Sequence, residues 1–251
     1  MLHEETVKMV NGAKVAVLFI HGIAGTPEHF RVLLPLEQLI PEEWSVYNLL
    51  LPGHGGTVED FSHSSMAGWK EYANVIFDRL CETHEKVILV GHSMGTLFSV
   101  QMALRRPEKV AFLFLIASPM LVGVKPYGAI NLIKLSWGIL DEHDPFQAAL
   151  GKVSAIRHTP LAWRYIGWLP RLYELLREMK STQSLVSELT VKCIAFQSRR
   201  DELVSCRSCD ILRSSGKVEL HGLRGSSHFY YAPHDVKTVQ KRFLDELKRW
   251  Q

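Results

Sequence analysis

The sequence Gly-His-Ser-Met-Gly at residues 91–95 is the stretch of this chain most suited to covalent chemistry. An apolar, β-branched run at residues 87–90 precedes it and predicts a strand that is buried on both faces. A helical pattern follows, so the serine would occupy a sharp strand-to-helix turn that requires flanking glycines. Such a turn would expose the Ser93 hydroxyl as a nucleophile and leave the Met94 N–H free to bind an oxyanion. The alternative is an ordinary glycine-rich connection between a strand and a helix.

A serine hydroxyl is a poor nucleophile until a neutral imidazole takes its proton, and a carboxylate must hold that imidazole in the correct tautomer. Asp201 lies just past a predicted strand at residues 191–196, and His228 lies in the loop after the next one, at residues 217–220. Because sites in parallel α/β sheets form at the carboxyl ends of the strands, we expect Ser93, Asp201 and His228 at one edge of the sheet.

Each of these assignments has competitors nearby. Glu202 is the nearest alternative acid, and Asp201 could instead be a surface residue of an arginine-flanked turn. His221 is too close to its own predicted strand to act as the base. His234 falls at a helix start, where capping or exposure is expected. These positions favour His228 as the base.

A second donor for the oxyanion is predicted after the strand at residues 15–20, which ends in His-Gly-Ile-Ala-Gly. This turn can bring the Ile23 N–H to the oxyanion that Met94 faces. The alternative is a turn glycine with an incidental histidine. Two further histidines near these motifs are interpreted as structural: His92 within the serine turn, and His54 within a loop that it would order.

The elements that must position these groups alternate between strands and helices, which predicts a mostly parallel central sheet with right-handed crossovers. Strands are predicted at residues 5–10, 15–20, 44–51, 87–90 and 110–116. Helices are predicted at residues 26–40, with a break or bend at Pro35 and Thr26 as a possible cap, at 66–84 and after 93. The pattern resumes near the end with the strands 191–196 and 217–220 and helices at 205–214 and 233–250.

Residues 119–189 interrupt this alternation with helical stretches at 130–140, 160–168 and 172–179. Seventy residues are too many for a plain connection, so we expect an inserted helical cap on a core formed by residues 1–118 and 190–251. Trp137, Trp163 and Trp168 are candidates for lining an acyl-binding pocket. The alternative is that they pack the cap onto the sheet.

Composition excludes several other classes of protein. The chain has 251 residues, 47% of them hydrophobic, and a net charge of +3, so it can bury a large core and shows no signal for nucleic-acid binding. Cys206 and Cys209 form a single C-x-x-C pair, and without a second pair or nearby histidines they are interpreted as two reduced thiols rather than a metal or redox site. We expect neither a metal nor an organic cofactor.

The location of the protein is predicted from two segments of the sequence, its N-terminus and its longest uncharged run. The N-terminus is acidic and lacks a signal-peptide core. The longest uncharged run, residues 110–124, is short for a membrane span and is broken by Ser118 and Pro119. We therefore expect a cytoplasmic protein without stable membrane insertion.

Five motifs, in this order, resemble the carboxylesterase and monoacylglycerol-lipase branch of the α/β-hydrolase superfamily: HGIAG, LPGHG, GHSMG, SRRDELV and GSSHF. The resemblance covers residues 10–118 and 190–250, and the cap matches by position alone. It implies an α/β-hydrolase fold and a triad of Ser93, Asp201 and His228, with oxyanion amides from Ile23 and Met94.

The resemblance also implies a reaction: hydrolysis of a small-molecule ester through an acyl-enzyme and without a cofactor. The apolar cap helices, with their tryptophans, further predict a small to medium acyl chain. The same scaffold also supports hydrolysis of an amide, lactone, thioester or C–C bond, and acyl transfer. A non-catalytic binding protein is disfavoured by the complete set of nucleophile, acid and base. Two departures from the family pattern are Thr96 and Ser227, at positions where glycine is frequent.

Overall fold

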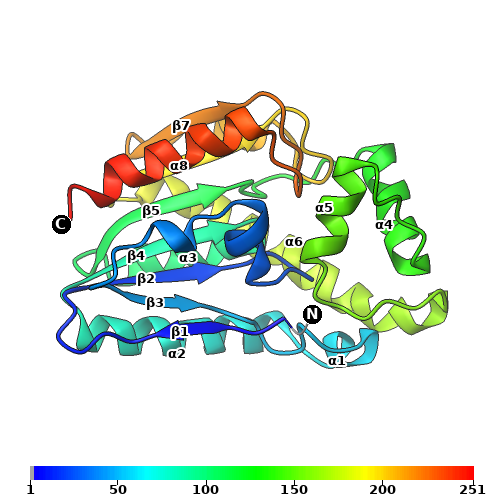
Figure 1. Ribbon diagram of the computed structural model, residues 1–251, viewed down its shortest axis with the longest axis horizontal. Coiled ribbons are helices and arrows are strands. Elements are labelled where there is room, and N and C mark those ends of the chain that lie inside the picture. Colours follow the sequence, from blue (N-terminus) through cyan, green and yellow to red (C-terminus); the bar gives the residue numbers. More distant parts are fainter. Residues whose placement is uncertain (1–2) are drawn as a thin grey trace.

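The computed structural model describes residues 3–251, and its core is a seven-stranded sheet with the order β1-β3-β2-β4-β5-β6-β7 (Figure 1). β1 is antiparallel to β3, and every other neighbouring pair in the sheet is parallel. The strands are β1 Thr6–Lys8, β2 Val15–Ile20, β3 Ser45–Asn48, β4 Lys86–His92, β5 Val110–Ile116, β6 Cys193–Ser198 and β7 Val218–Leu223. The predicted α/β fold with a mostly parallel sheet is confirmed.

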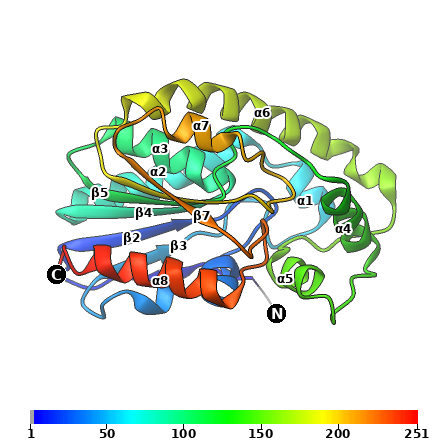
Figure 2. The ribbon, with the colours of Figure 1, turned by 90° about the horizontal axis from the view of Figure 1, so that it is seen from above.

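Helices cover both faces of this sheet. They are α1 Val58–Ser62, α2 Met66–Thr83, α3 Met94–Arg105, α6 Trp168–Leu185, α7 Ser208–Leu212 and α8 Pro233–Leu247. Successive side chains of a buried strand point to opposite faces, so in β4 Leu89 joins the core on one face and Val90 the core on the other. Figure 2 shows α2, α3, α6 and α7 over the first face and α8 over the second.

The stretch after β2 differs from the helix expected over residues 26–40. It forms a π-helical turn, His29–Leu33, and a 3-10 turn, Glu37–Leu39. Pro35 lies between the two turns, where its ring and its missing N–H are incompatible with a continuous helix. Thr26 does not cap a helix; its hydroxyl oxygen accepts a 3.4 Å hydrogen bond from the Glu28 N–H, just before the first turn.

Residues 119–189, here called the inserted segment, are largely helical. They contain α4 Pro126–Trp137, α5 Pro145–Val153, the 3-10 turn Ala162–Gly167, α6 and the short 3-10 turn Val186–Glu188. Figure 1 shows α4 and α5 beyond the arrowheads of the parallel strands, at the carboxyl edge of the sheet. Backbone hydrogen bonds join the segment to the loops of this edge, from Ala155 N to Ala24 O at 3.3 Å and from Arg157 N to Gly56 O at 2.9 Å.

The inserted segment exposes many large apolar side chains. In α4, Gly128 is the buried residue, and the other side chains of the helix are partly or fully exposed. The exposed large apolar residues of the segment include Tyr127, Ile130, Ile133, Trp137, Ile139, Trp163, Ile166, Leu169, Tyr173 and Leu176. Across residues 3–251, no helix has the length and apolar character needed to cross a membrane. The first two residues of the N-terminal stretch, which was expected to lack a signal-peptide core, lie outside the described part of the chain.

Candidate active site

Ser93 occupies the turn between β4 and α3, with φ 50° and ψ −122°. A positive φ is strained for a residue with a side chain, and strain of this kind is typical of functional turns. Close contacts require both flanking glycines. A Cβ atom on Gly91 would lie 2.8 Å from the backbone of Gly95, and one on Gly95 would lie 2.0 Å from the carbonyl oxygen of Ile20. The close approach of α3 to the end of β4 therefore explains Gly91, and its packing against the end of β2 explains Gly95.

The two positions that depart from the family pattern make hydrogen bonds instead. Thr96 is fully buried, and its hydroxyl donates to the carbonyl oxygen of Ser93 at 2.7 Å. The Ser227 hydroxyl accepts the Tyr230 N–H at 3.1 Å, and the Ser227 N–H donates to the Tyr230 carbonyl at 2.7 Å. Both side chains therefore fit their turns.

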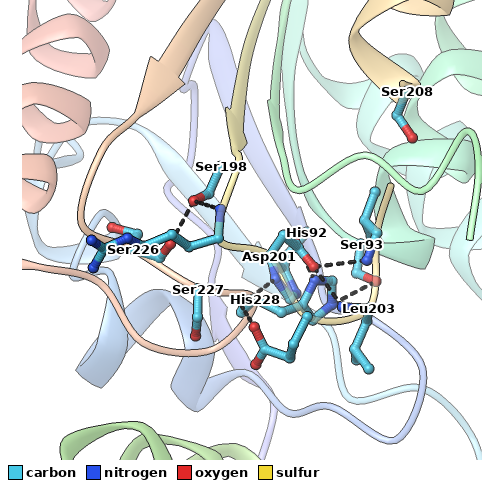
Figure 3. Close-up of polar contacts among 12 residues, drawn as sticks. His92, Ser93, Ser198, Asp201, Leu203, Ser208, Ser226, Ser227 and His228 are labelled. Carbon is cyan, nitrogen blue, oxygen red and sulfur yellow. Dashed lines mark hydrogen bonds and ion pairs between the residues drawn. The ribbon is translucent and has the colours of Figure 1, made fainter. Parts of the chain in front are cut away.

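The side chains of Ser93, Asp201 and His228 meet at the carboxyl edge of the sheet (Figure 3). Nε2 of His228 lies 3.1 Å from Ser93 Oγ, and Nδ1 lies 2.9 Å from Asp201 Oδ2. All three side chains are buried. With Nδ1–H donating to Asp201, a neutral His228 has its Nε2 lone pair free to accept the Ser93 proton.

The competing acid and histidines have other partners. Oε2 of Glu202 accepts a 2.8 Å hydrogen bond from the backbone N–H of His228, so this carboxylate binds the main chain and not the ring. His221 lies within β7, and its Nε2 is 2.8 Å from Glu219 Oε1. The side chain of His234 is exposed at the start of α8.

The electrostatics around His228 favour its protonated form. Burial alone would lower the pKa of the ring, but the Asp201 carboxylate, with which it is hydrogen-bonded, and the charge of Glu202 outweigh burial and raise that pKa. Asp201 is itself fixed, because its Oδ1 accepts the N–H groups of Leu203 at 2.9 Å and Val204 at 2.8 Å. The imidazolium that would form when Ser93 loses its proton is therefore stabilised in place.

The two predicted oxyanion donors come from neighbouring strands. β2 and β4 pair in parallel, with Ile20 opposite Gly91, so the loops that follow them emerge side by side. Met94 is the first residue of α3, where a backbone N–H has no acceptor within the helix. Ile23, in the loop after β2, lines the same cavity as Ser93.

This cavity is small and largely closed, with a volume of about 10 Å³, about the space that one water molecule needs. The inserted segment contributes Val153, at the end of α5. The complete lining consists of His21, Gly22, Ile23, Gly25, His29, His92, Ser93, Val153, His228 and Phe229. Ser93 itself has an exposed fraction of 7%.

The structure does not bring the three candidate tryptophans to this cavity. Trp137 and Trp163 are 60% and 64% exposed, on the outside of the inserted segment. Trp168 packs against Phe61, with a ring-centroid distance of 4.4 Å, and its indole N–H donates to Val58 O at 3.2 Å. Trp168 thus joins α6 to α1, the packing alternative named for it above.

A model of the "Alpha/beta hydrolase family" matches residues 17–240, most of the chain. The chain belongs to the α/β-hydrolase family. None of the curated proteins matches this hydrolase significantly in sequence. Many solved structures share its fold, and they include lipases, carboxylesterases and meta-cleavage product hydrolases.

Three of these structures illustrate the range. A structure from work on the metagenome-derived lipolytic enzymes LipS and LipT has 20% sequence identity and a TM-score of 0.70. The match covers 99% of this chain and 97% of the chain in that structure. A monoacylglycerol lipase from Paleococcus ferrophilus gives 15% identity and a TM-score of 0.66, over 97% and 98%. A meta-cleavage product hydrolase from Pseudomonas fluorescens IP01 gives 15% identity and a TM-score of 0.63, over 98% and 95%.

Two buried histidines shape the loops of this hydrolase around Ile23. His54 Nε2 accepts the Ala24 N–H at 3.1 Å, so His54 ties its own loop to the loop after β2. His21 Nε2 accepts the Leu51 N–H at 3.1 Å, which leaves Nδ1–H to donate to Gly22 O at 2.8 Å. Burial lowers the pKa of His21 to about 4 and that of His54 well below its ordinary value. Both rings are therefore neutral, as their acceptor roles require.

Two more buried rings, His29 and His92, pack beside the loops that carry Ser93 and His228. His92 Nε2 donates to the carbonyl oxygen of His228 at 3.1 Å. The ring of His29 stacks on His92 with a centroid distance of 3.6 Å and lies 3.0 Å, through Nε2, from the Tyr231 hydroxyl. Burial lowers the pKa of both rings well below the ordinary histidine value, so neither competes with His228 for a proton near neutral pH.

Several of these contacts had no predicted role in the site. His29 and Tyr231 are 202 positions apart, and no local pattern indicates that they meet. Val153 belongs to α5, a helix of nine residues that the sequence analysis did not predict. A signal for it exists in Asp144 and Pro145, a typical cap and first helical residue.

No cluster of three or more potential metal ligands occurs among residues 3–251. Cys206 is exposed in the turn that leads into α7, Cys209 is half-buried in the first turn of α7, and both are free thiols.

Proposed function

We propose that this protein is a serine carboxylic-ester hydrolase that acts through an acyl-enzyme on esters with small to medium acyl chains. The observation that carries the proposal is the hydrogen-bonded array from Ser93 Oγ through His228 to Asp201. An activated serine of this kind is the nucleophile of acyl-transfer reactions. The likeness to lipolytic enzymes and to a monoacylglycerol lipase supports an ester substrate.

The reaction would proceed in two halves. Ser93 Oγ attacks the ester carbonyl carbon while its proton passes to Nε2 of His228. The tetrahedral intermediate places its negative oxygen between the N–H groups of Ile23 and Met94. The C–O bond to the alcohol then breaks, and the alcohol leaves with the proton from His228.

Water completes the reaction. It attacks the carbonyl carbon of the acyl-enzyme while His228 takes one of its protons, and the acid is released as that proton returns to Ser93 Oγ. Asp201 holds Nδ1–H in both halves, so the same tautomer serves each proton transfer.

The inserted segment acts as a cap in this proposal, over a core formed by residues 1–118 and 190–251. Val153 already borders the cavity, and movement of α5 and its neighbours would open an apolar space for the acyl chain. The enzyme would need no metal or organic cofactor. Its free cysteines are in keeping with a reducing, cytoplasmic location.

The test is a comparison of Ser93→Ala with the unmodified enzyme on p-nitrophenyl esters. Loss of the nucleophile should lower kcat by about 10⁴-fold or more, since only residual catalysis by binding and the oxyanion hole would remain. A fluorophosphonate probe should label the unmodified protein and not the variant. Ser184→Ala, at an exposed position of α6, is the matched control. Retention of more than about a tenth of the rate in Ser93→Ala would show that the nucleophile is another group.

A parallel panel separates the ester reaction from its alternatives on this scaffold. Amide, lactone and thioester substrates with the same acyl group should be hydrolysed more slowly than the best ester. A diketone, as a probe for hydrolysis of a C–C bond, should not be turned over. If one of these substrates exceeds all esters in kcat/KM, the proposed reaction class is wrong although the triad stands.

A further inference from the structure

Glu202 contacts the catalytic histidine at a point that Asp201 does not reach. Its Oε2 accepts the backbone N–H of His228 at 2.8 Å, while Asp201 binds the ring. Two successive carboxylates thus hold one histidine by its main chain and by its side chain. Glu202 is buried, with an exposed fraction of 7%, and it is absent from the lining of the cavity beside Ser93.

The first helix of the inserted segment covers Glu202. A Cβ atom added to Gly128 of α4 would lie 2.8 Å from Glu202 Cβ, so the helix backbone rests directly on this side chain. The Lys125 N–H also donates to the carbonyl oxygen of Glu202 at 2.8 Å. This covering excludes water, and charges separated by a medium of low dielectric constant interact strongly.

Four of the other ionisable groups around His228 and Glu202 are uncharged near neutral pH. Burial lowers the pKa values of His29 and His92, and burial raises the pKa values of Tyr127 on α4 and Tyr231 on the histidine loop. Asp201 is the remaining acidic neighbour, and the cationic Arg200, beside it in the same loop, is exposed. Burial raises the pKa of Glu202 itself, while the positive charge of His228 and the N–H bond that Glu202 accepts oppose this rise. In its ionised form, Glu202 acts on His228 without a buried cation to neutralise it.

We propose that Glu202 is a positioning residue for His228: it fixes the histidine main chain by accepting its N–H, and its negative charge stabilises the imidazolium formed when Ser93 is deprotonated. The proposal rests on the function proposed above for His228 as general base. Glu202 acts on His228 and does not touch the substrate. It contributes in two ways: it accepts the backbone N–H, which a glutamine amide could also do, and it supplies a negative charge, which a glutamine would lack.

The experiment separates these two contributions with the variants Glu202→Gln and Glu202→Ala. NMR titration of the ¹⁵N-labelled His228 ring gives its pKa directly and needs no substrate. In Glu202→Gln the pKa of His228 should fall by about half a unit or more, because one negative neighbour is lost. The matched control is Glu82→Gln, an exposed position on α2, in which the pKa of His228 should not change.

Labelling by the fluorophosphonate probe then measures the reactivity of Ser93 across pH. Glu202→Ala leaves the buried His228 N–H without an acceptor, so its maximal labelling rate should fall by about tenfold or more. Glu202→Gln should keep most of that rate, since its amide oxygen can accept the same N–H, while the midpoint of its pH profile moves to lower pH. With any ester that is turned over, KM should change little in both variants, because Glu202 lies outside the cavity.

The proposal is overturned if Glu202→Gln leaves the pKa of His228 unchanged, or if Glu202→Ala labels as fast as the control. If Glu202→Ala does not fold, the titration of Glu202→Gln decides. A protein that shows the expected shift in the titration but hydrolyses no ester would leave the role of Glu202 intact and refute the proposed function.

Discussion

Nδ1 of His228 lies 2.9 Å from Asp201 Oδ2, while the other oxygen of the same carboxylate is held by two backbone N–H groups. Asp201 therefore cannot rotate freely, and its orientation dictates the tautomer of the ring. The adjacent Glu202 has a similar charge and burial but a different atom of His228 as its partner. The two acids are distinguished by geometry and not by residue type.

The substitution Asp201→Asn should lower kcat by about 10³- to 10⁴-fold, because an amide can stabilise the wrong tautomer of His228. The fold should persist, since an amide oxygen can still accept the N–H groups of Leu203 and Val204. Steady-state kinetics and a thermal melt measure the two effects. Asp210→Asn, at a surface position of α7, is the control. A loss in Asp201→Asn smaller than about tenfold would reassign the acid.

Acid should destabilise the fold through four buried histidines. Burial lowers the folded-state pKa values of His21, His29, His54 and His92, to about 4 for His21. Their stabilising contribution is complete above the unfolded pKa near 6.5 and is lost as pH falls from there toward the folded values. Each ring then contributes a slope of about 1.4 kcal/mol per pH unit to the free energy of unfolding.

Urea unfolding between pH 7 and pH 5 measures this slope. The pKa of His228 is raised, so its contribution has the opposite sign: it is complete below pH 6.5 and is lost as pH rises through the folded pKa. The variant His29→Gln should have a shallower slope by about 1.4 kcal/mol per pH unit. A stability that is flat over this range would show that these rings protonate within the fold.

The substitution Gly95→Ala should lower the free energy of unfolding by about 3 kcal/mol or more, because the added Cβ would lie 2.0 Å from Ile20 O and must force α3 away from β2. Gly216→Ala is a matched control, since a Cβ there meets nothing within 4 Å. Its effect should stay within about 0.5 kcal/mol. Equal stabilities of the two variants in urea would mean that α3 can shift away from β2 with little loss of free energy.

Medium acyl chains should be preferred over acetyl. Each buried methylene contributes about 0.8 kcal/mol, so four more methylenes in a hexanoyl ester could raise kcat/KM by about two orders of magnitude if the opened pocket holds them. Charged or sugar-like acyl groups should react poorly. The measurement is kcat/KM for p-nitrophenyl esters from C2 to C14. A maximum at acetyl with a steep decline would refute an apolar acyl pocket beneath the inserted segment.

The sheet and the positions of Ser93, Asp201 and His228 were predictable because each depends on a local signal. A buried strand followed by a turn places the next residue at the carboxyl edge, and parallel pairing brings those edges together. The helix expected over residues 26–40 failed, since Pro35 divides it into two short turns. The sequence pattern showed that Pro35 would disturb the helix but not that the residues on either side would leave α-helical geometry.

The inserted segment was predictable in its helicity and not in its packing. Regularly spaced apolar residues indicate which face of a helix is buried. They do not indicate which segment, distant in the sequence, packs against that face. Trp168 packs against Phe61, more than a hundred positions away in the sequence, while Trp137 and Trp163 are exposed. The role of Glu202 has the same origin, since its partner lies 26 positions downstream in another loop.

The start of the inserted segment is tied by backbone hydrogen bonds to the loop that carries Asp201, from Gly123 N to Leu203 O at 3.0 Å and from Lys125 N to the neighbouring Glu202 carbonyl. For protein engineering, this contact means that a chimera should not exchange the whole inserted segment. The exchange point should lie after the residues that bind the Asp201 loop. A chimera that takes the proposed cap from a relative should keep residues 119–128 and exchange the inserted segment from position 129. The exchanged part then carries most of the proposed acyl-binding region, while the loop that carries Asp201 keeps its native backbone contacts.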